Sequence, residues 1–447
     1  MTIDRRGFIA AGAALAVAPV LASAASTTTG RTFPKGFLWG AATAGHQIEG
    51  NNINSDCWVM ENVKPTMFAE PSRDAANSFA LWRTDLDLAK DLGLNTYRFS
   101  LEWARIEPEE GLFSPAMLDH YKAIIEGCRA RGLTPMVTFN HYTVPRWFAA
   151  SGGWTNPESP TLYARYCNRA MRHLGAHIGY ATTLNEPNIM NILRIVLPPQ
   201  MFDAQRAMLT AAARATASQK FVGGNAVNPE DIDAVTANLV AGHKAGRAAI
   251  KAVRPDLPVG VSLSMFDDQA AGTNSIRDAM RVKLYQPWLD AVRGDDFLGV
   301  QNYERQVWNS DGKLPSPAGA DVNYMGSEVY PPSLAGAVRY AYQATGIPII
   351  VSEHGVGTAD DKVRARLIPA ALAELKTAMD EGIPVKGYCH WSLIDNFEWI
   401  FGYKVKFGLH SVDPVTFVRT AKPSAAIYGA IARRNALSRA SLSGTTG

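Results

Sequence analysis

The sequence is poor in cysteine and has no surplus of charge of either sign. Its 447 residues include four widely spaced cysteines and no CxxC pair: Cys57, Cys128, Cys167 and Cys389. A scaffold built from disulfides is therefore excluded for a chain of this size, although the spacing leaves open whether one pair is bonded. Lysine and arginine number 44 against 41 acidic residues, a net charge of +3. With no basic excess to attract polyanions, we expect neither nucleic acid nor an anionic membrane as a partner.

Other chemical signatures are also missing. No GxGxxG follows the first strand-like run, and no P-loop motif occurs anywhere. The histidines are scattered, and no group of His, Cys and carboxylates has the spacing of metal ligands. The sequence therefore predicts no cofactor and no catalytic metal.

The N-terminal segment has the composition of an export signal. It reads "MTIDRRGFIAAGAALAVAPVLASAAS", with Arg5-Arg6 first, then an apolar run, then small residues at Ala22-Ser23-Ala24. This order is typical of a cleavable signal, and paired arginines resemble a twin-arginine signal. The apolar run is too short and too rich in alanine for a convincing membrane span. We expect residues 1–25 to be a signal peptide, the mature protein to be periplasmic or secreted, and no membrane attachment after removal; the alternative is a disordered basic tail.

From residue 31 onwards, short β-branched or aromatic runs alternate with runs of helical periodicity. Eight strand-like runs occur, at 37–45, 96–103, 134–142, 180–188, 258–265, 296–303, 348–355 and 385–393. Helical patterns follow five of them, at 74–93, 115–132, 162–179, 233–253 and 364–382. This alternation without a linker predicts a single (β/α)8 TIM barrel over residues 31–437, with a doubly wound open sheet as the rival. Residues 438–447 are expected to form a disordered tail.

Polar and aromatic residues gather where the predicted strands end. They are Gln47, Glu49, Arg98, His141, Asn185, Glu186, Tyr303, Glu353 and Trp391. Active sites of (β/α)8 barrels lie at this end of the barrel, so these residues are candidates for ligand binding.

Two of these residues are carboxylates suited to acid–base and nucleophilic work. Glu186 ends the fourth strand within "TLNEPN", and Glu353 ends the seventh within "PIIVSEHG". Pro187 disfavours the helical region for the residue before it, so we expect Glu186 to be held extended at the rim. Strands four and seven are expected to face each other across the barrel mouth. A pair of carboxylates with different pKa values is what glycosidic bond cleavage requires.

The chain also resembles family 1 of the glycoside hydrolases, which includes β-glucosidases and β-galactosidases. The resemblance runs from "FPKGFLWGAATAGHQIEG" at 33–50 to "HWSLIDNFEWIFGYKVKFGLHSVD" at 390–413. It implies that Glu186 of "NEP" is the general acid/base and Glu353 of "SEHG" the nucleophile of a retaining mechanism. It also implies that Asn185 holds the sugar 2-hydroxyl.

The same resemblance assigns further residues to the site. It implies that Arg98 and Tyr303 contact the nucleophile and favour its ionised form, while Glu186 stays protonated. The implied sugar-binding residues are Gln47, His141, Trp391, Glu398, Trp399 and Phe407. A carboxylate at Glu398 opposes 6-phosphoglycosides as substrates.

Some positions depart from the family pattern. Gln301 and His354 stand where the family usually has Asn, Tyr142 stands where Trp or Phe is common, and Ile400-Phe401 is unusually apolar. The segment 192–219 is apolar and methionine-bearing, and it forms either an apolar leaving-group subsite or simple helix core.

Together these features predict an exported, retaining, exo-acting β-glycosidase, with β-glucosidase as the first choice. Its partner would be a small β-glycoside or short oligosaccharide, and the oligomeric state stays open. A transglycosylase on the same site and a catalytically impaired carbohydrate-binding barrel are the alternatives.

Overall fold

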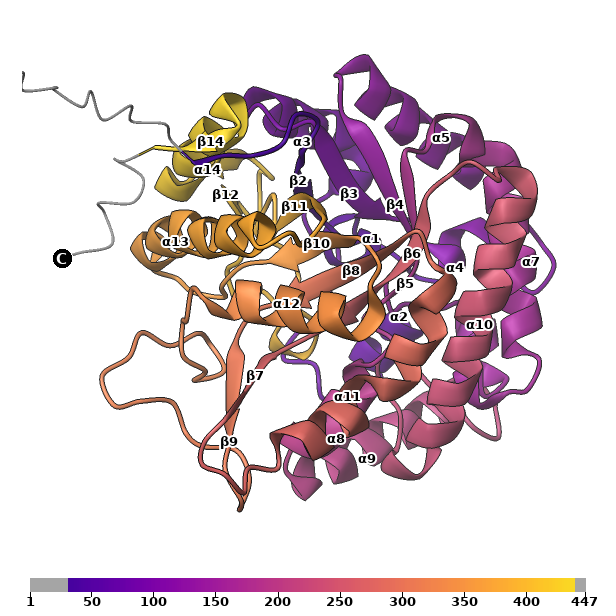
Figure 1. Ribbon diagram of the computed structural model, residues 1–447. Coiled ribbons are helices and arrows are strands. Elements are labelled where there is room, and N and C mark those ends of the chain that lie inside the picture. Colours follow the sequence, from indigo (N-terminus) through magenta and orange to yellow (C-terminus); the bar gives the residue numbers. More distant parts are fainter. Residues whose placement is uncertain (1–30, 439–447) are drawn as a thin grey trace, which may run out of the picture.

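The computed structural model describes residues 31–438, and eight parallel strands form a closed barrel at its centre (Figure 1). The barrel strands are β2 (Leu38–Ala42), β3 (Thr96–Ser100), β4 (Thr134–Asn140), β5 (Tyr180–Asn185), β6 (Val259–Ser264), β8 (Phe297–Asn302), β10 (Ile349–His354) and β11 (Val385–Trp391). Each strand pairs with the next along the chain, and β11 closes on β2. The predicted single (β/α)8 barrel is confirmed, and every predicted strand run contains one of these strands. The predicted signal peptide and the tail beyond residue 438 lie outside the described residues and stay predictions.

The strands are buried on both faces, as their composition suggests. All residues of β2, β3, β6, β8 and β10 are buried. Parallel strands covered by helices on the outside and filled with side chains on the inside require such near-continuous apolar runs. The polar residues Arg98, Asn185 and Glu353 within these strands are therefore exceptions that need a partner.

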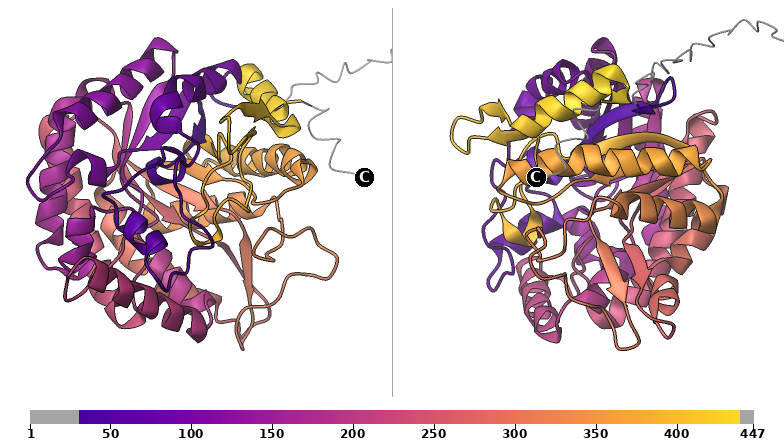
Figure 2. Two further views of the ribbon diagram at one scale, coloured as in Figure 1. Left: turned by 180° about the vertical axis from the view of Figure 1, so that it is seen from behind. Right: turned by 60° about the vertical axis from the view of Figure 1, so that its left-hand side comes forward.

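Helices surround the barrel on its outside (Figure 2). The five predicted helices are α3 (Ser78–Asp91), α5 (Pro115–Ala130), α7 (Ser159–Leu174), α10 (Ile232–Val253) and α13 (Asp361–Asp380). Three more, not predicted, are α11 (Arg277–Ala291), α12 (Ser333–Thr345) and α14 (Pro423–Arg434). Local sequence signals set where a helix begins, as α5 shows. Ser114 caps α5 by accepting a hydrogen bond from the Met117 amide at 3.3 Å, and Pro115 stands at the first helical position.

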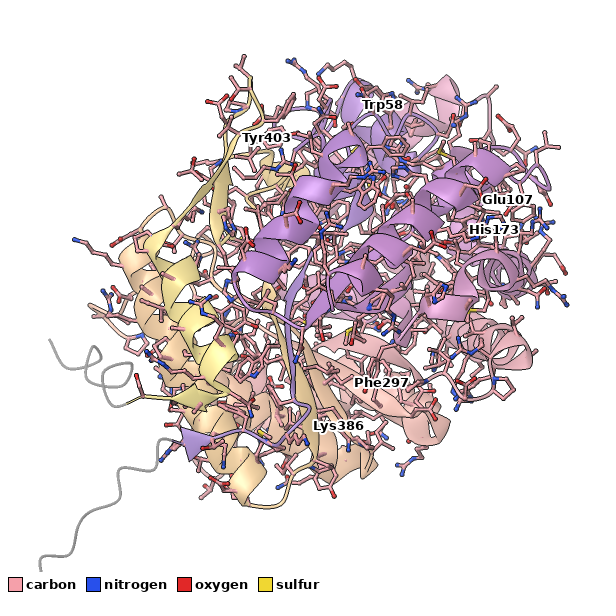
Figure 3. All side chains as sticks on the ribbon, turned by 90° about the horizontal axis from the view of Figure 1, so that it is seen from above. Trp58, Glu107, His173, Phe297, Lys386 and Tyr403 are labelled. Atoms are coloured by element: carbon pink, nitrogen blue, oxygen red, sulfur yellow. The ribbon has the colours of Figure 1, made fainter. Side chains whose placement is uncertain are left out.

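The segments that follow the strands form further elements at the carboxyl end of the barrel. They are α1 (Gly45–Ile48), α2 (Asp56–Asn62), α4 (Trp103–Ile106), α6 (Arg146–Ala150), α8 (Ile189–Val196), α9 (Pro199–Ala215), the two-stranded sheet β7 (Asp267–Ala270) with β9 (Arg305–Trp308), and the pair β12 (His410–Val412) with β13 (Arg419–Ala421). In Figure 3, Phe297 and Lys386 at strand starts lie at one end, and Trp58 and Tyr403 from loops after strands lie at the other. The loops that follow the strands are thus gathered at one end, as a (β/α)8 barrel requires.

The two ends of the described chain meet beside the barrel. Strand β1 (Arg31–Thr32) pairs antiparallel with β14 (Ala436–Leu437). The Trp39 Nε1 donates to Asn435 Oδ1 at 2.9 Å and so fastens the barrel to the last helix. All four cysteines are free and buried, which answers the disulfide question left open by the sequence. Within residues 31–438, no helix combines the length and apolar character needed to cross a bilayer.

Candidate active site

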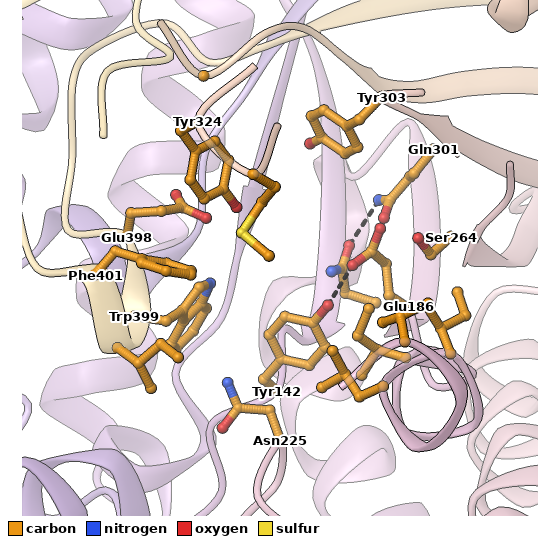
Figure 4. Close-up of a pocket in the computed structure, with 18 of the residues that line it drawn as sticks. Tyr142, Glu186, Asn225, Ser264, Gln301, Tyr303, Tyr324, Glu398, Trp399 and Phe401 are labelled. Atoms are coloured by element: carbon orange, nitrogen blue, oxygen red, sulfur yellow. Dashed lines mark hydrogen bonds between the residues drawn. The ribbon is translucent and has the colours of Figure 1, made fainter. Parts of the chain in front are cut away.

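A cavity of about 330 Å³ opens at the carboxyl end of the strands (Figure 4). Ten of the eleven predicted site residues line it: Gln47, His141, Asn185, Glu186, Tyr303, Glu353, Trp391, Glu398, Trp399 and Phe407. The eleventh, Arg98, is fully buried and reaches the cavity only through the residues it contacts. Residues spread over the whole chain are therefore brought to one place by the barrel.

Glu353 lies near the end of β10, held by a cation and a phenol. Arg98 Nη1 donates to its Oε1 at 2.5 Å, and the Tyr303 hydroxyl donates to its Oε2 at 2.5 Å. The register of β10 shifts between Val351 and Glu353, and such irregularities re-aim side chains near active sites. Burial raises the pKa of Glu353, and Arg98 and then Tyr303 oppose that rise. Of the two catalytic candidates, Glu353 has the partners that favour a carboxylate.

Glu186 follows β5 directly and does not have the predicted extended backbone. Its φ is +42°, in the left-handed region. Pro187 disfavours the right-handed helical region for Glu186, and the observed left-handed backbone avoids that region without being extended. Its amide donates to Ser262 O at 2.8 Å and its carbonyl accepts from the Ile189 amide at 2.9 Å. The chain thus turns within a few residues from strand to helix α8, and the positive φ is the conformation that makes this turn.

The carboxyl of Glu186 is in a different environment from that of Glu353. Its Oε2 accepts a hydrogen bond from the Tyr142 hydroxyl. Burial, and next the negative charge of Glu353, raise the pKa of Glu186 to about 8. A protonated Glu186 beside an ionised Glu353 is therefore the arrangement that the surroundings favour near neutral pH.

β5 and β10 are three steps apart around the barrel rather than directly opposite. Both side chains nevertheless line the same cavity. The expectation that the two strands face each other is therefore only approximately met, while both carboxyls still reach one ligand site.

Asn185 is held by three neighbours. Its Oδ1 accepts from Arg98 Nη2 at 2.5 Å and from Gln301 Nε2 at 2.8 Å, and its Nδ2 contacts His141 Nε2 at 3.2 Å. Burial, and then the charge of Arg98, lower the pKa of His141 well below its usual range, so its ring is neutral and its Nε2 accepts. The network fixes the Asn185 amide beside Glu186. Gln301 belongs to this network, although the sequence singled it out only as a departure from the family.

Polar and aromatic groups meet at another part of the cavity. Gln47 Nε2 donates to Phe397 O at 2.8 Å and to Glu398 Oε2 at 3.3 Å. Burial, followed by the charges of Glu353 and Glu186, raises the pKa of Glu398 to about 8. Amide and carboxyl groups of this kind pair with hydroxyls.

Flat rings stand beside these polar groups. The His141 ring stacks on Trp391 at 5.6 Å and 17° and on Trp399 at 6.2 Å and 13°. Phe407 packs edge-on against Tyr303 at 5.7 Å and Tyr324 at 5.8 Å. Tyr324, Tyr142 and Ser264 also line the cavity and were not predicted as site residues. Tyr324 lies between β9 and α12, where the sequence has no strand signal that would place it.

Two residues near the strand ends lie away from the cavity. Glu49 is paired with Arg105 at 2.8 Å, and His354 Nδ1 contacts the Tyr388 hydroxyl at 2.9 Å. Neither lines the cavity. The His354 departure from the family pattern therefore does not touch a ligand there. No cluster of His, Cys, Asp and Glu within residues 31–438 has metal-binding geometry.

Comparisons with known proteins agree with this geometry. Residues 29–229 and 262–437 match the profile of glycosyl hydrolase family 1. A β-glucosidase from Agrobacterium sp. (strain ATCC 21400) is 28% identical, over 91% of this chain and 96% of that protein. A β-galactosidase from Pyrococcus woesei is 25% identical, over 91% of this chain and 98% of that protein.

Solved structures also resemble this chain over most of its length. The apo structure of a β-glucosidase, 1317, has a TM-score of 0.86 and 40% identity, covering 89% of this chain and 98% of that chain. The β-glycosidase BGL167 has a TM-score of 0.85 and 46% identity, covering 90% and 98%. The chain therefore belongs to glycosyl hydrolase family 1 and is an enzyme that hydrolyses O-glycosyl bonds, a β-glycosidase.

Proposed function

We propose that this β-glycosidase is a retaining, exo-acting enzyme that removes terminal β-D-glucosyl residues from small glycosides. The observation that carries the proposal is the contrast between the two carboxyls in one cavity. Glu353 is bound by Arg98 and Tyr303, whereas the pKa of Glu186 is raised to about 8. One group is thus suited to attack and the other to donate a proton.

In the first step, a Glu353 oxygen attacks the anomeric carbon while Glu186 gives its proton to the departing glycosidic oxygen. The bond to the leaving alcohol breaks and an ester bond to Glu353 forms. In the second step, the ionised Glu186 takes a proton from water, and the water oxygen displaces Glu353. The product keeps the β configuration because the anomeric carbon is inverted twice.

Glucose recognition rests on the polar groups around Gln47. Gln47 Oε1 and His141 Nδ1 are buried and have no hydrogen-bond partner in the protein. A sugar hydroxyl would satisfy each of them, as buried polar groups require. Asn185 would hold the 2-hydroxyl, Glu398 and Trp399 the outer hydroxyls, and Trp391 the flat sugar face. Exo action is supported by the burial of Gln47 together with its neighbours Asn396 and Phe397, which indicates a closed end to the cavity.

The stereochemistry provides the test. Proton NMR during hydrolysis of a β-glucoside should show β-glucose first, with α-glucose arising only by later mutarotation. A 2-deoxy-2-fluoro glucoside with a good leaving group should inactivate the enzyme, and peptide mapping should place the label on Glu353. First appearance of α-glucose, or a label on another residue, would refute the retaining assignment.

We also propose that the enzyme is exported, from the pattern of residues 1–25. Replacing Arg5-Arg6 by Lys-Lys should keep the protein in the cytoplasmic fraction, because a twin-arginine signal depends on that pair. An unchanged distribution between cytoplasm and periplasm would contradict this route.

A further inference from the structure

One wall of the cavity, beyond Glu186, is an apolar helix face. Helix α8 begins at Ile189, three residues after Glu186. Its residues Ile189, Ile192, Leu193 and Val196 line the cavity, and their spacing of i, i+3, i+4 and i+7 places them on one face. The apolar face thus begins beside the carboxyl that protonates the leaving group and continues outwards from it.

The next helix extends this wall. Met201 and Met208 of α9 line the cavity, with Gln205 between them. In all, six of the thirteen methionines of the chain line this one cavity. Methionine side chains are flexible and polarizable, so they fit irregular apolar surfaces.

The opposite rim is also apolar. Tyr324 and Met325 are 40% and 53% exposed although both are large and apolar. Tyr324 packs edge-on against Phe401 at 5.1 Å, and Figure 4 shows this pair across the cavity from Glu186. The unusual Ile400-Phe401 pair therefore belongs to the rim.

The burial of α8 and α9 shows that segment 192–219 is in part helix core and in part cavity wall. Ile192 and Met208 are buried, whereas Ile189 and Leu193 are half-buried and Val196 is 38% exposed. Arg194, on another face, pairs with Asp233. Solvent therefore meets the apolar stripe at the cavity, where a ligand would cover it.

Several polar side chains on this side are already occupied. Glu304 accepts from Gln306 Nε2 at 2.6 Å and from Asn323 Nδ2 at 3.1 Å. Gln205 Nε2 donates to Val227 O at 2.7 Å. A second sugar placed here would lose hydrogen bonds to water and regain few from the protein, which is costly.

From these observations we infer that the preferred substrates are β-glucosides of apolar alcohols or phenols, rather than disaccharides. The inference rests on the β-glycosidase function proposed above and specifies the leaving group. The α8 stripe and the Tyr324–Met325 rim would enclose the aglycone, and Glu186 would protonate the oxygen that joins it to the sugar.

Alkyl β-glucosides test this directly, because their leaving alcohols have similar acidity and differ mainly in apolar area. We expect kcat/KM to rise by about threefold per buried methylene, and so by about a hundredfold from methyl to octyl glucoside when about four of the seven added methylenes are covered, measured below the micelle concentration. Cellobiose should be a poorer substrate than hexyl glucoside.

Two variants on different sides of the subsite separate binding from folding. Leu193→Asn and Met325→Asn should each reduce the octyl-to-methyl ratio of kcat/KM by about tenfold, since each puts a polar group against the alkyl chain. Val322→Asn is the matched control, because Val322 is exposed on the same loop as Met325 and does not line the cavity. It should keep the wild-type ratio.

The outcomes are distinguishable. If all glucosides are hydrolysed but cellobiose is preferred, the apolar subsite is overturned and the proposed function stands. The same holds if kcat/KM does not depend on alkyl length. An unchanged ratio in both Leu193→Asn and Met325→Asn would also overturn it. No hydrolysis of any member, nitrophenyl glucoside included, would overturn the proposed function and this inference with it.

Discussion

The raised pKa of Glu186 predicts how activity depends on pH. Burial and the charge of Glu353 raise this pKa from 4.5 to about 8. The protonated fraction should then fall from about 0.9 at pH 7 to about 0.1 at pH 9. Hydrolysis of a glucoside with a poor leaving group needs that proton, so its kcat/KM should fall about tenfold over this range. An ordinary pKa would leave only about 0.3% of the acid protonated at pH 7.

A second titrating group requires a control. The pKa of Glu398 is also raised to about 8, so it would change charge over the same range. Loss of a sugar contact at Glu398 would affect all glucosides alike, because the sugar is the same. Loss of the acid at Glu186 would spare dinitrophenyl glucoside, whose leaving group needs little protonation. Comparing hexyl and dinitrophenyl glucosides therefore shows whether Glu186 or Glu398 causes the fall in kcat/KM at alkaline pH, the alkaline limb of the pH profile.

The Glu186→Gln variant completes the experiment. It keeps the size of the side chain but cannot donate the proton, so kcat/KM for hexyl glucoside at pH 7 should fall by about 10²–10⁴. Its alkaline limb should disappear, and dinitrophenyl glucoside should lose far less. Equal losses for the two substrates, or an alkaline limb that persists in the variant, would refute the acid role of Glu186.

Four further predictions concern the same site. Tyr303→Phe removes a hydrogen bond to buried Glu353, so kcat/KM should fall about 10–100-fold, and the acidic limb should move to higher pH because the ionised form loses a donor. Glu353→Gly should abolish hydrolysis, and azide should restore turnover with formation of the α-glycosyl azide, which chromatography detects. Since the folded pKa of Glu186 lies above its ordinary value, its burial costs stability as pH rises from 4.5 to about 8; Glu186→Gln should therefore raise the thermal midpoint more at pH 8.5 than at pH 5. Activity should be unchanged in EDTA, and a loss that zinc or magnesium restores would contradict metal-free catalysis.

The barrel could be predicted because each strand carries its own local signal. Runs such as "PIIVSEHG" are short, β-branched and followed by helical periodicity, and these patterns depend only on neighbouring residues. Helix α11 was missed because its sequence has no clear amphipathic pattern and contains Pro287, so tertiary packing against the barrel stabilises it instead. Helix α12 does carry a local signal, because its buried residues Leu334, Ala337, Val338 and Ala341 recur at helical spacing.

The amino-acid sequence by itself determined the barrel, and the family pattern in it named the two glutamates. The tertiary structure alone decided how each glutamate is held. The positive φ of Glu186, the Tyr142 contact and the Gln301–Asn185 hydrogen bond join residues far apart in the chain, and no local pattern specifies them. It also decided that Ile189, Leu193 and Val196 of α8 stay partly open to the cavity, because exposure depends on what the rest of the chain covers.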